Sequence, residues 1–87
     1  MLEIHWTDES EAHIAAHGVT PSEVEQATLR PRYLQPGRDE TTLLFGRTTA
    51  GRYLFVVLAE AVDGRSYIVT AYDMTPNQRK VFNKNAK

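Results

Sequence analysis

Residues 52–61 read RYLFVVLAEA, and this stretch decides the fold class of the chain. In an extended strand its apolar side chains fall on both faces: Tyr53, Phe55 and Val57 on one, and Leu54, Val56 and Leu58 on the other. Strands that are apolar on both faces are typical of sheet centres that other elements cover on each side. We therefore expect residues 52–61 at the centre of a sheet, with both faces covered at least in part.

Turn signals on both sides of this strand predict antiparallel neighbours. Residues 49–51 (TAG) form a turn after a predicted strand at residues 41–48, and Asp63-Gly64 is a hairpin signal before a predicted strand at residues 66–73. A weaker strand pattern at residues 32–35 precedes the turn dipeptide Pro36-Gly37. The middle of the chain is therefore an antiparallel β-meander.

The N-terminal part combines a strand pattern with helix signals. Leu2, Ile4 and Trp6 alternate with polar residues and predict a short strand with one buried face. Asp8 and Glu11 have the spacing of a capping box, which predicts a helix from Asp8 to about His17. Gly18 supplies the left-handed conformation that ends a helix, and Val19 supplies the apolar contact that accompanies it.

Two further helices begin with the same signal, TPSE at residues 20–23 and TPNQ at residues 75–78. In each, threonine is the N-cap, proline takes the first helical position, and Glu or Gln completes the capping box. The first of these helices is predicted to bury Val24, Ala27 and Leu29 and to end at Arg30-Pro31. The last runs through Val81 and Phe82. The expected fold is a single α+β domain over residues 1–87, with a strand and a helical hairpin packed on the meander and a C-terminal helix after it.

Length and composition agree with one small domain. The chain has 87 residues, 41% of them hydrophobic, and no cysteine, so neither disulfides nor thiolate metal sites can stabilise it. The longest apolar run, residues 53–59, is far shorter than the ~20 residues that span a bilayer. The first residues lack the basic and apolar regions of a secretory signal. We therefore expect a cytoplasmic protein with no membrane segment.

The formal net charge of -1 conceals an uneven distribution of charge. Residues 1–29 carry six acidic side chains and no Lys or Arg, whereas residues 30–87 carry ten basic and five acidic side chains. These counts give -6 for the first part and +5 for the second. Such asymmetry suggests two different contact surfaces. The alternative is that the charges interleave in three dimensions and only solvate the surface.

Two familiar kinds of site are disfavoured. The predicted hairpin has the short glycine-containing turn of a helix-turn-helix motif, but Glu23 and Glu25 would meet DNA phosphates with the wrong sign. His13 and His17 are four residues apart and could face the same way, with Glu9 as a possible third ligand, yet no matched Cys or carboxylate pair accompanies them. We expect neither DNA recognition by the hairpin nor a required metal ion.

Arginines concentrate at the predicted strand ends. Arg47 and Arg52 flank the turn at residues 48–51, Arg65 follows the next turn, and Arg79 lies in the last helix. Guanidinium groups pair with phosphate oxygens and stabilise charge that develops on phosphorus, so these residues are candidates for RNA contact. The bases of RNA could stack on strand tyrosines, of which the candidates are Tyr53, Tyr67 and Tyr72. The alternative is that these arginines are solvated and the tyrosines pack.

The ordered motifs resemble the BrnT family of toxins from bacterial type II toxin-antitoxin systems, which share the RelE-like ribonuclease fold. The matching features, in order along nearly the whole chain, are Trp6, HGVT (17–20) with SEVEQA (22–27), FGRT (45–48), GRYLFVV (51–57) and VTAYDMTPNQRKVF (69–82). The resemblance implies a metal-independent endoribonuclease that inhibits translation. It also implies inhibition by a cognate BrnA-like antitoxin, of ribbon-helix-helix type, with RNA as the other partner. A homo-oligomer is a further possibility because a domain of this size has only a small core.

The catalytic positions that this resemblance implies are Arg52, Gln78 and Phe82. The family combines a sheet arginine with a glutamate and a tyrosine one helical turn apart, so Gln78 and Phe82 stand where a carboxylate and a phenol are expected. Neither side chain can exchange a proton in that role. Arg52, Arg47, Tyr72 and His5 could form a substitute site, since charge stabilisation and positioning alone accelerate reactions. The alternative is a catalytically degenerate module that binds RNA or protein.

Overall fold

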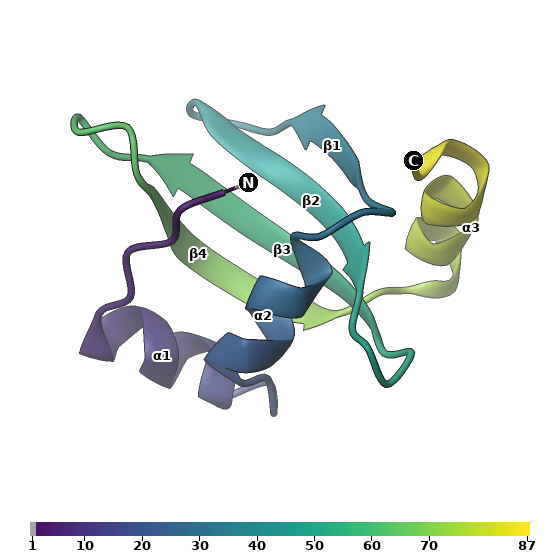
Figure 1. Cartoon of the computed structure of the whole chain (residues 1–87), viewed down its shortest axis with the longest axis horizontal. Coiled ribbons are helices and arrows are strands. Elements are labelled where there is room, and N and C mark those ends of the chain that lie inside the picture. Colours follow the sequence, from purple (N-terminus) through teal and green to yellow (C-terminus); the bar gives the residue numbers. More distant parts are fainter. Residues whose placement is uncertain (1) are drawn as a thin grey trace.

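A four-stranded antiparallel sheet lies at the centre of the computed structural model, which describes residues 2–87 (Figure 1). Its strands are β1 (Tyr33–Pro36), β2 (Thr41–Arg47), β3 (Tyr53–Glu60) and β4 (Ser66–Asp73), in the order β1-β2-β3-β4. Each strand therefore pairs with its neighbour along the chain. The position of β3 between β2 and β4 confirms the predicted central strand and the predicted meander.

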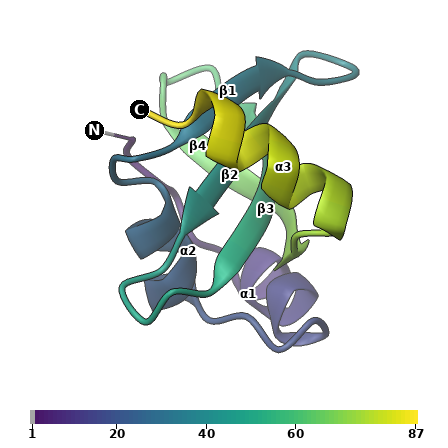
Figure 2. The same cartoon turned by 90° about the vertical axis from the view of Figure 1, so that its right-hand side faces the viewer.

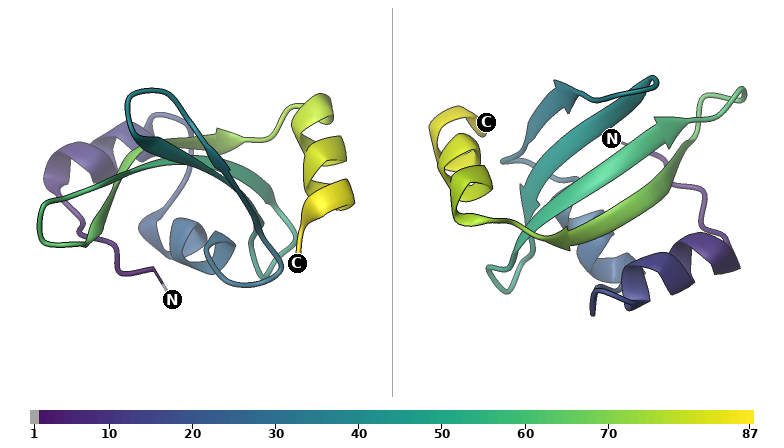
Figure 3. Two further views of the ribbon diagram at one scale, coloured as in Figure 1. Left: turned by 90° about the horizontal axis from the view of Figure 1, so that it is seen from above. Right: turned by 180° about the vertical axis from the view of Figure 1, so that it is seen from behind.

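Three helices complete the fold: α1 (Asp8–Ala15), α2 (Pro21–Ala27) and α3 (Pro76–Asn85). α1 lies beside β4 and α2 crosses β2 and β3, whereas α3 lies at the other end of the molecule (Figures 1 and 3). The predicted α+β class and element order are confirmed, apart from the form of the N-terminal strand. None of the helices in residues 2–87 has the length and apolar composition needed to cross a membrane.

Each sheet face packs its own apolar cluster, which confirms the two-sided pattern of residues 52–61. On the hairpin face, Leu54, Val56 and Leu58 pack with Ile14 and Val24. On the α3 face, the buried residues are Phe45, Phe55, Met74 and Phe82. Several side chains of the α3 face, including Leu43, Val57 and Tyr72, remain half-buried, so α3 covers only part of that face.

A glycine lets α2 approach the sheet closely. A Cβ atom added to Gly46 of β2 would overlap the backbone carbonyl of Ala27, the last residue of α2. Ala27 and Val24 are both fully buried, as predicted. Because the obstacle is backbone rather than a movable side chain, only glycine fits at position 46 without displacing α2.

The predicted N-terminal strand is reduced to one parallel bridge between Ile4 and Ser66. The His5 amide donates to the Ser66 carbonyl at 2.7 Å, and the Ser66 amide donates to the Glu3 carbonyl at 2.8 Å. Leu2, Ile4 and Trp6 nevertheless pack against the hairpin-face cluster, as their alternation predicts. The segment leaves β4 after this bridge because its chain turns toward α1, so no ladder forms.

Several details of the predicted helical hairpin were wrong. Thr7, not Asp8, caps α1, because Thr7 and Ser10 form the reciprocal capping box and Asp8 is already the first helical residue. The helix also ends at Ala15 rather than near His17. Leu29 is 52% exposed rather than buried, because α2 ends at Ala27 and Leu29 no longer follows its buried face. The capping boxes of α2 and α3, at Thr20–Glu23 and Thr75–Gln78, are confirmed.

Candidate nucleic-acid interface

Arg52 joins the helical hairpin to the end of the sheet. Its Nε and Nη2 atoms donate to the two carboxylate oxygens of Asp73 at 2.6 and 3.2 Å, and its Nη1 atom donates to Glu23 at 3.2 Å. The same guanidinium donates to the backbone carbonyls of Gly18 at 2.8 Å and His17 at 3.4 Å. We call Arg52, Glu23 and Asp73, with these two carbonyls, the Arg52 clamp.

The clamp fixes the charge of all three side chains. The hydrogen bonds from Arg52 lower the pKa of Asp73, and those with Asp73 and Glu23 raise the pKa of Arg52 although burial opposes this. The pKa of Glu23 is lowered first by the backbone hydrogen bond from Thr20 and then by Arg52. The Arg52 side chain is 27% exposed, so each ion pair contributes on the order of 1 kcal/mol rather than more.

The hydrogen bonds of Arg52 are those of a residue that stabilises the fold. All three of its guanidinium nitrogens hold hydrogen bonds, and these face the hairpin side of the sheet, as alternation along β3 requires when Tyr53 faces α3. A direct role in cleavage would require Arg52 to release at least one carboxylate. Its assignment as a catalytic residue stays a prediction.

The other two family-matched positions also have structural partners. The Gln78 side-chain oxygen accepts from the Thr75 amide at 2.9 Å and completes the cap of α3. Phe82 is 5% exposed and meets the Tyr53 ring edge to face, with centroids 5.6 Å apart. The structure therefore does not bring Arg52, Gln78 and Phe82 together as one polar site.

Arg47 and Arg79 converge on one aromatic ring. Each guanidinium carbon lies 5.0 Å from the centroid of the Tyr53 ring, a distance typical of a cation-π contact. The two guanidinium carbons are consequently at most twice that distance apart. Neither arginine forms an ion pair within residues 2–87. We call Arg47, Tyr53 and Arg79 the two-arginine site; its charge is available to an anion.

Tyr72 belongs to an aromatic row that crosses the α3 face near this site. Its ring lies 5.2 Å from Phe55 and 5.9 Å from His17, and the row continues through Phe45 to Tyr33. Tyr72 remains half-buried, so one part of its ring stays accessible. The Tyr53 ring, in contrast, is occupied by Arg47, Arg79 and Phe82 and offers little surface to a base.

Arg65 and His5 lie at the opposite end of the sheet. Arg65 is at the β3–β4 turn, where its side chain pairs with Asp63 at 2.8 Å, and His5 bonds through its backbone to Ser66. β3 has eight residues at about 3.3 Å each, which separates Arg65 from Tyr53 by more than 20 Å on that estimate. Neither residue shares a site with Arg47 and Arg79.

The acidic N-terminal part and the basic remainder of the chain meet at one ion pair within residues 2–87. Arg52 brings the acidic N-terminal part and the basic part together by pairing with Glu23. α3 contains Arg79, Lys80 and Lys84 and no acidic residue. The acidic helices α1 and α2, which carry Asp8, Glu9, Glu11, Glu23 and Glu25, lie beside β4 and across β2 and β3, away from α3 (Figure 3). Whether the acidic and basic parts form two contact surfaces stays a prediction.

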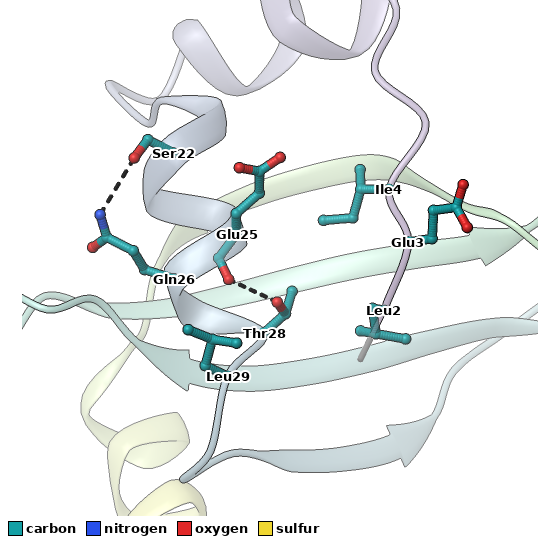
Figure 4. Close-up of a pocket in the computed structure, with 8 residues that line it drawn as sticks. All are labelled: Leu2, Glu3, Ile4, Ser22, Glu25, Gln26, Thr28 and Leu29. Atoms are coloured by element: carbon teal, nitrogen blue, oxygen red, sulfur yellow. Dashed lines mark hydrogen bonds between the residues drawn. The ribbon is translucent and has the colours of Figure 1, made fainter.

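A sizeable pocket lies on the acidic side, between the N-terminal segment and α2. It has a volume of about 610 Å³ and an apolar lining that includes Leu2, Ile4 and Leu29 (Figure 4). Glu3 and Glu25 line it as well, and Glu25 also accepts from the Trp6 indole at 2.9 Å. An apolar hollow with carboxylates disfavours phosphate, so this pocket does not fit the RNA hypothesis.

Among residues 2–87, no three His, Cys, Asp or Glu side chains come together as a metal-binding group. His13, His17 and Glu9 do line one shallow hollow on α1. The His17 ring contacts Tyr72, and its backbone carbonyl accepts from Arg52. His17 is thus part of the surroundings of the clamp and the aromatic row.

Sequence reasoning missed the partners of Arg52. The sequence predicts Glu23 as a capping residue and as an acidic group of the helical hairpin, and Asp73 as the end of a strand, but it predicts neither as a partner of Arg52. The register of β3 and β4 places Asp73 opposite Leu54, next to Arg52. A β-bulge shifts this register between Val57 and Leu58. A register counted only from the length of the β3–β4 hairpin therefore pairs the wrong residues.

Comparisons with protein-family models, curated proteins and solved structures give no match for this chain. The resemblance to BrnT toxins therefore rests on the sequence motifs alone.

The lowered pKa values in the clamp predict acid sensitivity. A carboxyl with a lowered pKa stabilises the folded state above its ordinary value, here 4.5 for Glu23 and 3.8 for Asp73, and that stability is lost as pH falls through the lowered pKa. Asp73→Asn should reduce stability near neutral pH and weaken its further decline below about pH 3.8, the ordinary pKa of Asp73.

Urea unfolding at a series of pH values from about 7 to about 3 measures this effect. Glu60→Gln is the control, because Glu60 forms no ion pair within residues 2–87. An acid profile of Asp73→Asn that parallels those of the wild type and Glu60→Gln would contradict the role of the clamp.

Proposed function

We propose that this chain is the toxin component of a bacterial type II toxin-antitoxin system and that it acts on RNA in the cytoplasm. The observation that carries this proposal is the two-arginine site, where Arg47 and Arg79 both contact Tyr53 and neither forms an ion pair in the described part of the chain. Cations held in place by a ring, beside a helix without acidic residues, suit a polyanion better than a neutral or cationic ligand.

The chemistry that fits this site is metal-independent cleavage by the RNA's own 2′-hydroxyl. The protein must then hold the scissile phosphate and stabilise the charge that develops on it, which paired guanidinium groups can do. Tyr72, half-buried beside Phe55, offers an aromatic edge for a neighbouring base and a hydroxyl. This is the endoribonuclease form of the proposal, and it accounts for inhibition of translation.

A second candidate function is RNA binding without cleavage. A specific observation favours it, because Gln78 caps α3 and Phe82 is buried in the core. The α3 positions where the BrnT family places a carboxylate and a phenol therefore stabilise the fold here. In both forms of the proposal RNA binds at the two-arginine site, and the forms differ only in whether the bound strand is cut.

The partner proposed on either form is a BrnA-like antitoxin of ribbon-helix-helix type. Inhibition requires competition with phosphate, so its contact segment should present acidic or apolar groups to α3 and Arg47. A homo-oligomer, if one forms, must leave this side accessible to RNA. A ribbon-helix-helix reading frame beside the gene would support the system.

The two-arginine site predicts a loss of RNA affinity when either arginine is replaced. Arg47→Ala and Arg79→Ala should each weaken binding of a single-stranded RNA about tenfold, because each removes one charged contact with a phosphate. The measurement is fluorescence anisotropy at fixed salt, with induced expression in a bacterial host as the growth assay. Arg65→Ala is the control and should change affinity less than twofold, since Arg65 lies at the far end of the sheet. Equal losses for Arg65→Ala and Arg79→Ala would refute the assigned site.

A double variant of α3 distinguishes cleavage of RNA from binding of RNA. Gln78→Glu keeps the helix cap, because a carboxylate oxygen accepts the Thr75 amide as the amide oxygen does, and Phe82→Tyr adds a hydroxyl to the ring beside Tyr53. If the wild type only binds RNA, the double variant should gain cleavage that the wild type lacks. Gel analysis of labelled RNA measures this, and thermal unfolding checks the fold. Cleavage by the wild type at the rate of the double variant would exclude the binding-only form.

A further inference from the structure

A second cationic hollow lies at the C-terminal end of α3, away from the two-arginine site. It has a volume of about 590 Å³ and is lined by four basic residues, Arg30, Arg32, Lys84 and Lys87, together with Tyr33 and Asn85. They come from two parts of the chain, the segment between α2 and β1 and the last turn of α3. Figure 2 shows the C-terminal end beside β1. We call this hollow the terminal basic pocket.

Backbone contacts build this pocket. The Arg32 amide donates to the Lys87 carbonyl at 3.3 Å, and the Lys87 amide donates to the Arg32 carbonyl at 3.1 Å. Two hydrogen bonds hold the last turn of α3. The Ala86 amide donates to the Phe82 carbonyl, and the Asn85 side chain donates to the Val81 carbonyl. The cations are therefore brought together by chain geometry and not by attraction to a shared carboxylate.

The charge of the pocket is uncompensated within residues 2–87. Its lining contains no acidic residue, and none of its four basic residues forms an ion pair there. The partial negative charge at the C-terminus of α3 can favour a cation such as Lys84, but it amounts to about half a charge. The helix dipole offsets only part of the positive charge of the four basic residues, so a bound anion would relieve their mutual repulsion.

We infer that the terminal basic pocket binds a backbone phosphate of the same RNA strand that the two-arginine site contacts. This inference rests on the proposed function. Two of the pocket cations are arginines, whose planar guanidinium groups match phosphate oxygens in pairs. Tyr33, half-buried in the lining, adds a hydroxyl and a ring edge.

The position of the pocket favours RNA over an acidic protein. α3 has ten residues and is therefore about 15 Å long, with the two-arginine site near its first turn and the terminal basic pocket at its last. Lys80 lies between Arg79 and Lys84 in the sequence of α3, and no acidic residue interrupts the helix. A strand that carries a charge on every nucleotide can contact this whole track, whereas the carboxylates of a protein segment have no such regular spacing.

The test compares two matched arginines. Arg30→Gln removes one exposed guanidinium from the pocket, and Arg38→Gln removes one exposed guanidinium from the β1–β2 turn, with the same change in net charge. Arg30→Gln combined with Lys84→Gln should weaken binding of single-stranded RNA about tenfold. It should also flatten the dependence of log affinity on log salt by about 0.7 for the lost phosphate contact. Arg38→Gln should change affinity less than twofold.

Inorganic phosphate provides a readout independent of RNA. Titration should shift the amide resonances of Asn85 and of Leu34, which also lines the pocket, in the wild type and not in the double variant. Equal loss of RNA affinity for Arg30→Gln and Arg38→Gln would overturn the pocket, as would full RNA binding by the double variant. In either case the proposed function survives if Arg47→Ala still weakens binding. No RNA binding by the wild type would overturn both. Stronger competition for the pocket by polyglutamate than by RNA of equal charge would assign it to an acidic protein.

Discussion

The Arg52 clamp is the interaction on which the arrangement of this molecule depends. One guanidinium joins the α1–α2 turn, the first turn of α2 and the end of β4, three segments that no backbone ladder connects. The clamp also holds the acidic hairpin against the sheet at the only ion pair that joins the two charged parts of residues 2–87. Without Arg52, the carboxylates of Glu23 and Asp73 would lose the cation that they share.

The clamp has a consequence on the other face of the sheet. Arg79 lies close enough to Asp73 to contribute to the lowered pKa of that carboxyl, yet Asp73 is bonded to Arg52 and Arg79 lies over Tyr53. We therefore interpret Arg52 as a positioning residue. By occupying Asp73, it leaves the charge of Arg79 to a ligand, and the same logic extends along α3, where no carboxylate competes with phosphate.

The fold could be predicted from the sequence because its signals are local. The two-sided apolar pattern of residues 52–61 gives the central strand, and the Thr-Pro boxes give the starts of α2 and α3. The site was less predictable, because its contacts depend on register and on side-chain reach. The β-bulge beside Val57 decides what lies next to Arg52, and Tyr53 collects Arg47 and Arg79 from elements 32 residues apart in the chain. Neither follows from periodicity.

We propose that Arg52 promotes RNA binding by occupying Asp73 and not by touching RNA. The most direct measurement is the RNA affinity of Arg52→Ala compared with that of Arg52→Ala combined with Asp73→Asn, with thermal unfolding as a check on the fold. Arg52→Ala should bind about fivefold more weakly, since an exposed pair between Asp73 and Arg79 stabilises the unbound state by about 1 kcal/mol. The double variant should regain wild-type affinity because it lacks that carboxylate. A folded double variant that binds as weakly as Arg52→Ala would contradict the account and indicate that Arg52 contacts RNA itself.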